Sequence, residues 1–90
     1  MRVPSITSVE NAIRIYYEHI ELHNKDIIEL FGKLSSVTIV KLKSEAYNVM
    51  LRKSIPSWNA AAVNTKAAYM AWGLDINDLE SRYEKLKQLS

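Results

Sequence analysis

The 90-residue chain has no cysteine, only two glycines and two prolines, and a single phenylalanine. Without cysteine it can form neither a disulfide framework nor a thiolate metal site, which fits a reducing cytoplasm. So few glycines and prolines leave helix as the default expectation. No apolar run approaches the roughly 20 residues of a membrane helix, and the N-terminus lacks the apolar stretch of a signal peptide. We therefore expect a cytoplasmic protein with no membrane partner.

The chain also carries little net charge. Twelve Lys and Arg stand against ten Asp and Glu, so the net charge is +2. The distribution is uneven, however. Residues 33–53 hold five bases and one acid, whereas residues 10–29 hold five acids and two bases. Because a nucleic-acid partner responds to local potential rather than to net charge, the middle of the chain is the candidate contact region.

The length and the 48% hydrophobic content predict one globular domain over residues 1–90. Apolar spacing and capping residues predict an all-α, five-helix fold without strands. Thr7 and Glu10 form a candidate capping box for the first helix, and Asn24 is the candidate cap of the second. The remaining predicted helices span about 35–51, 57–72 and 76–89. Ser57 is the candidate cap of the fourth helix, and either Asp75 or Asn77 with Glu80 is the candidate cap of the fifth.

The segment from Lys25 to Lys43 carries the functional signal. A short helix over residues 25–31 is followed by Gly32, which can adopt positive φ, and by a longer helix that opens with two serines. Ile27 and Phe31 on the first helix would meet Ile39 and Leu42 on the second. The inward stripe of the second helix would continue through Ala46 and Val49 or Met50.

This segment resembles the helix-turn-helix family of small bacterial and phage DNA-binding proteins over about residues 25–43. The resemblance implies a helix-turn-helix at 25–50, with the helix at 35–51 as the recognition helix that enters the major groove of double-stranded DNA. Ile28 stands where the family usually has a small residue, and the turn is one residue longer than the common spacing. We expect the longer turn to accommodate the larger side chain.

The predicted DNA-contacting residues are polar, slender or basic and come from the turn and the second helix. Residues near the N-terminus of a recognition helix meet base edges, which assigns that role to Ser36, Val40 and Lys41. Lys33, Ser35, Thr38 and Lys43 would contact phosphates. The full predicted set is Lys33, Ser35, Ser36, Thr38, Val40, Lys41, Lys43 and Ser44. The expected function is that of a small transcriptional regulator or of an accessory factor of a phage or mobile element.

Other chemistry has little support in the sequence. His19 and His23 have a spacing that can bind a metal, but a solvated helix face explains them better, and we predict no metal or other cofactor. The chain has no cysteine nucleophile and no glycine-rich phosphate loop, so we predict neither enzyme activity nor a small-molecule substrate.

The aromatic and C-terminal residues leave one alternative function open. Basic residues are not interleaved with Trp58, Tyr69 and Trp72. We therefore expect these aromatic side chains in the core rather than stacked on the nucleobases of single-stranded nucleic acid. An apolar seam of Ile76, Leu79, Tyr83 and Leu86 is predicted to pack within the domain, or else against a second copy as a homodimer. The alternative function is therefore a helical protein-interaction or oligomerisation module that binds no nucleic acid.

Overall fold

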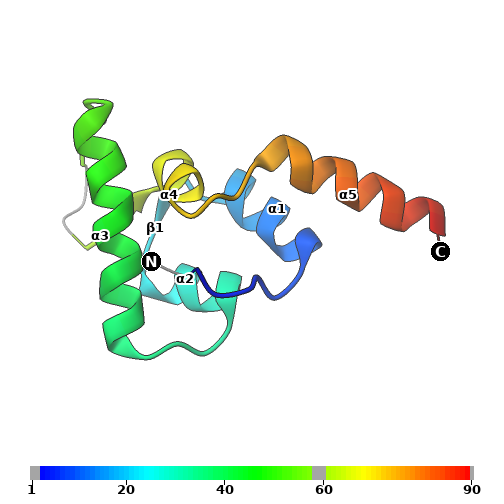
Figure 1. Ribbon diagram of the computed structural model, residues 1–90, viewed down its shortest axis with the longest axis horizontal. Coiled ribbons are helices and arrows are strands. Elements are labelled where there is room, and N and C mark those ends of the chain that lie inside the picture. Colours follow the sequence, from blue (N-terminus) through cyan, green and yellow to red (C-terminus); the bar gives the residue numbers. More distant parts are fainter. Residues whose placement is uncertain (1–2, 58–60, 90) are drawn as a thin grey trace.

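A computed structural model describes residues 3–57 and 61–89 of the chain. Within these residues the protein is mostly helical, as predicted, but it also has two short strands that the sequence did not indicate (Figure 1). The elements are α1 (Val9–Glu18), β1 (Glu21–Leu22), α2 (Asn24–Phe31), α3 (Ser36–Arg52), β2 (Val63–Asn64), α4 (Thr65–Ala71) and α5 (Ile76–Leu89). No helix in the described segments combines the length and the apolar character needed to cross a membrane.

The start of α1 differs from the predicted capping box. Ser8 is the N-cap, and its Oγ accepts a hydrogen bond from the Asn11 backbone N–H at 3.0 Å. Thr7 instead ties this segment to the end of α2: its N–H donates to the Leu30 carbonyl at 2.8 Å, and its hydroxyl contacts the Glu29 and Leu30 carbonyls. The Thr7–Glu10 prediction was wrong because Ser8 takes the cap position, while the Thr7 hydroxyl donates to the end of α2 and accepts from the Asn11 side chain at 3.1 Å.

The sequence places the end of the first helix at His23 and Asn24, but the helix is shorter in the structure. α1 stops at Glu18, and β1 precedes α2. The N-cap of α2 is His23 rather than Asn24, and the Asp26 carboxylate reaches back to accept from the His23 N–H at 2.9 Å. A carboxylate in the first turn satisfies an otherwise orphan donor and complements the helix dipole.

The fourth helix is much shorter than the predicted span of 57–72. Residues 58–60, which belong to the predicted first turn and include Trp58, lie outside the described residues. Val63 pairs antiparallel with Leu22, and Asn64 then caps α4 by accepting from the Ala67 N–H at 2.9 Å. An asparagine side chain competes with the helix ladder for backbone donors, which is why the helix starts here.

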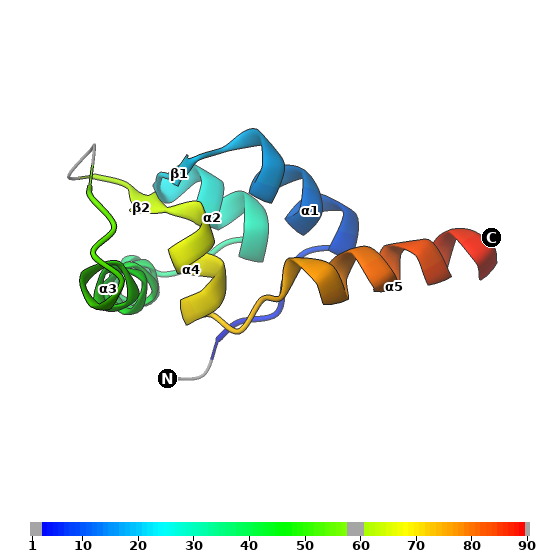
Figure 2. The same cartoon turned by 90° about the horizontal axis from the view of Figure 1, so that it is seen from above.

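α4 lies at the centre of the core, between α3 and α1 (Figure 2). Tyr69 and Trp72 are buried, as predicted. The Tyr69 hydroxyl donates to the Ala12 carbonyl of α1 at 2.6 Å, and the Trp72 indole N–H donates to the Leu42 carbonyl of α3 at 2.9 Å. Buried aromatic polar groups are thus satisfied while α4 holds two other helices in place.

The molecule is elongated, with extents of 41 × 28 × 22 Å. α3 lies at one end of the long axis, and α5 projects from the other end (Figure 1). α5 begins as predicted, with the Asp75 carboxylate accepting from the Asn77 N–H at 2.9 Å, and it packs against α1. The intramolecular packing predicted for its seam is confirmed at Leu79, which is 6% exposed.

Candidate nucleic-acid interface

The two helices that carry the predicted interface begin and end close to their expected positions. α2 ends at Gly32, whose φ of 89° and ψ of −168° belong to a region that side chains strongly disfavour. The chain then crosses residues 33–35 and enters α3, where Ser35 caps the helix by accepting from the Thr38 N–H at 3.2 Å. Gly32 is therefore required by the backbone of this turn.

The apolar sides of α2 and α3 join the same core. The residues predicted to meet between them, Ile27, Phe31, Ile39 and Leu42, are all buried in one cluster, and the stripe continues through Ala46, Val49 and Met50. Ile28, for which the resemblance implied a smaller residue, is 40% exposed and lies outside this buried cluster. The opposite side of α3 consequently faces solvent.

Four of the predicted contact residues share the solvent-facing side of α3. Ser36, Val40, Lys41 and Ser44 are all exposed, at a spacing that places them on one helix face. Val37 is exposed on the same face. Sequence reasoning did not select it, although its spacing of three to Val40 and four to Lys41 could have placed it there. We call these five residues the α3 outer face.

Ser35 and Thr38 have a local structural role at the start of α3. Besides the cap bond, their hydroxyl oxygens lie 2.9 Å apart and share a hydrogen bond. Both residues were predicted to contact phosphates. The structure places them beside the α3 outer face, where they fix the geometry of the first turn.

Lys43 is separated from the other predicted residues. Its Nζ donates to Asn24 Oδ1 at 3.1 Å and to the Ala61 carbonyl at 2.8 Å, so it connects α3 with the start of α2 and with the segment before β2. Lys33, by contrast, is exposed in the turn. Among the described residues neither Lys33 nor Lys41 takes part in an ion pair, so their charges are available to a ligand.

The side chains of His19 and His23 both lie close to the buried carboxylate of Asp26. The sequence had instead predicted that they lie on a solvated helix face. His19 Nε2 lies 3.5 Å from Asp26 Oδ1, and His23 Nδ1 lies 3.7 Å from Asp26 Oδ2. Because Asp26 also binds the His23 backbone, this cluster organises the start of α2. In the parts of the chain that are described, no group of three or more His, Cys, Asp or Glu side chains is arranged to hold a metal ion.

Comparisons of the chain with protein-family models, with curated proteins and with solved structures found no match.

Proposed function

We propose that the protein binds double-stranded DNA by placing the α3 outer face in the major groove. The observation that carries this proposal is a 17-residue helix whose inner side is buried and whose outer side presents small polar groups and two valines. The same side presents Lys41, which has no ion pair within residues 3–57 and 61–89. A helix with its side chains measures about 10–12 Å across, and the major groove is about 12 Å wide.

The residue roles follow from position along α3. Ser36, Val40 and Lys41 lie where base edges would be read: a lysine can donate to guanine acceptors, and a valine can contact a thymine methyl group. Lys33 in the turn would neutralise a phosphate. The Trp72 hydrogen bond to the Leu42 carbonyl holds α3 against α4 and favours a preformed reading surface.

The biological setting is part of the same proposal. A single domain with one reading helix and a modest positive charge suits a small transcriptional regulator, or an accessory factor of a phage or mobile element, acting in the cytoplasm. This function requires no cofactor and no catalytic group.

Fluorescence anisotropy with random-sequence duplex DNA tests the proposal. Binding should weaken steeply as salt rises, because each neutralised phosphate releases counterions. Lys41→Glu should lower the affinity by about tenfold or more. Lys66→Glu makes the same charge change on α4, beside Tyr17 and Ile20 rather than on α3, and serves as the matched control. Equal affinities of parent and Lys41→Glu proteins, or salt-independent binding, would refute the proposal.

A further inference from the structure

The apolar side chains of α5 become more exposed from its N-terminal to its C-terminal end. Leu79 in its first turn is 6% exposed, whereas Leu86 is 54% exposed and Leu89 is 84% exposed. Tyr83, between them, is half-buried. A 14-residue helix is marginal in water unless an apolar face is covered. The outer half of α5 therefore has an apolar face that its own domain does not cover.

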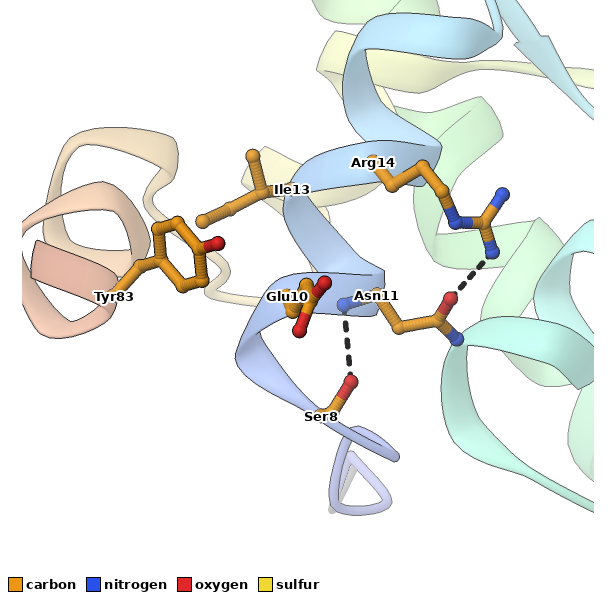
Figure 3. Close-up of a pocket in the computed structure, with 6 residues that line it drawn as sticks. All are labelled: Ser8, Glu10, Asn11, Ile13, Arg14 and Tyr83. Atoms are coloured by element: carbon orange, nitrogen blue, oxygen red, sulfur yellow. Dashed lines mark hydrogen bonds between the residues drawn. The ribbon is translucent and has the colours of Figure 1, made fainter. Parts of the chain in front are cut away.

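A groove runs between this half of α5 and the start of α1. One hollow of about 410 Å³ is lined by Ile13 and Tyr83, and a second by Val9 and Leu86, with Glu10 and Tyr83 common to both. Figure 3 shows the Ile13 and Tyr83 side chains directed toward each other, with Glu10 beside them. Two cations, Arg14 and Lys87, also line the hollows. Arg14 pairs with Glu18 and Glu29, and Lys87 pairs with Glu84, so Glu10 is the one lining charge that has no ion pair among the described residues.

Glu10 in the groove and Lys85 on the protruding helix carry opposite charges. Glu10 takes part in no ion pair among the described residues, and the same is true of Lys85 on the outer half of α5. One chain therefore carries both the groove with Glu10 and the exposed helix end with Lys85. A two-fold dimer requires such a self-complementary surface, since each copy must offer both halves of the contact.

We propose that the α1–α5 groove of each protomer receives the outer half of α5, with Leu86 and Leu89, from a second copy of the chain. Lys85 of each copy then approaches Glu10 of the other. The contact lies at the end of the molecule opposite α3, so both α3 outer faces stay open (Figure 1). The inference does not depend on DNA binding, and it is tested without DNA.

Sedimentation equilibrium of the full chain, over a wide concentration range, measures the dimer directly. The parent protein should show a monomer–dimer equilibrium, and the double variant Leu86→Glu, Leu89→Glu should raise the dissociation constant by about tenfold or more. Both side chains are exposed, so the monomer of the variant should still fold, as its helical circular dichroism spectrum would show. Its unfolding temperature should be lower only at concentrations at which the parent is dimeric. Leu51→Glu is the matched control, because Leu51 is 79% exposed at the end of α3, and its dimer should be unchanged.

A charge exchange separates this contact from any other self-association. Glu10→Lys alone and Lys85→Glu alone should each weaken the dimer, and the combined variant should restore it. A parent protein that is monomeric at every concentration would overturn the proposal, as would a dimer that the Leu86 and Leu89 changes leave intact. Dimerisation that the charge exchange fails to restore would place the contact elsewhere.

Discussion

The Tyr69 hydroxyl donates a hydrogen bond of 2.6 Å to the backbone carbonyl of Ala12. The two residues are 57 positions apart in sequence, and their bond joins α4 to α1 through the middle of the core. Both residues are buried, so water cannot replace either partner. This bond is thus one of the contacts that fix the position of α4, on which both α1 and α3 rest.

Tyr69→Phe should lower the free energy of unfolding by about 1 kcal/mol, because it removes one buried hydrogen bond and keeps the ring. Urea denaturation followed by circular dichroism measures the change. Tyr47→Phe is a comparison variant, because the Tyr47 hydroxyl donates to the Ala62 carbonyl at 3.2 Å from a part-buried position. Loss of this bond should lower the free energy of unfolding by a smaller amount. A Tyr69→Phe protein as stable as the parent would mean that the bond contributes nothing net.

Alkaline pH should destabilise the protein through the same residue. Burial raises the pKa of Tyr69 well above its ordinary value of 10.0. The unfolded chain would lose this proton near pH 10 while the folded chain keeps it, so stability is fully present below about pH 10 and falls as pH rises beyond it. Tyr69→Phe should show a shallower decline in urea midpoint between about pH 9 and about pH 11. Identical pH profiles would exclude Tyr69 as the source.

Ser54 and Gly73 occupy equivalent positions after α3 and α4. Replacing Ser54 with glycine and Gly73 with serine should change the stability of the fold in opposite directions. Each has positive φ, and each is followed by a residue whose N–H closes a wide turn, Ile55 to the Met50 carbonyl and Leu74 to the Tyr69 carbonyl. Such helix ends favour glycine. Ser54→Gly should therefore stabilise the fold by about 0.5–1 kcal/mol, and Gly73→Ser should destabilise it by a similar amount, as measured by thermal unfolding. A loss of stability in Ser54→Gly would contradict this prediction.

Removal of the α4 cap should be costly despite the short helix. Asn64→Ala deprives the Ala67 N–H of its acceptor and should cost about 1 kcal/mol in urea denaturation. Asn48 is exposed within α3, so Asn48→Ala is a matched control that should be neutral or slightly stabilising. Equal effects of the two variants would argue against the capping role.

Substitutions of Lys41 and Lys43 should have different effects, one on DNA affinity and the other on stability. Lys43→Met removes the bonds to Asn24 and to the Ala61 carbonyl, so it should lower stability by roughly 1 kcal/mol in urea denaturation. Lys41→Met should leave the urea midpoint unchanged and weaken duplex binding in the anisotropy assay. The reverse pattern would show that Lys43, rather than Lys41, faces the ligand.

The sequence predicted the elements whose signals are local. Capping serines, Gly32 and the apolar stripe of Ile39, Leu42 and Ala46 placed α2 and α3 to within a residue or two, and Asp75 marked α5. The two strands could not be predicted, because a two-residue strand shows no alternation and is defined only by its partner, as Leu22 is by Val63. The long fourth helix was wrong for the same reason, since pairing at Val63 outweighed the helix propensity of the alanines around it.

For the candidate site, sequence reasoning selected Ser36, Val40, Lys41 and Ser44, all of which lie on the α3 outer face. It could not separate Lys43 from Lys41. Both residues are basic and two positions apart, and only the tertiary position of Asn24 and Ala61 shows that the Lys43 ammonium is occupied.

The bond from the Trp72 indole to the Leu42 carbonyl has a consequence for observing the protein in solution. Its proton is buried between α3 and α4, so it should exchange with deuterium only when these helices separate. The indole resonance of Trp72 thus reports, at a single atom, whether α3 stays seated when a ligand arrives. Protection that is unchanged on binding would indicate rigid docking, and faster exchange would indicate that the helix must loosen first.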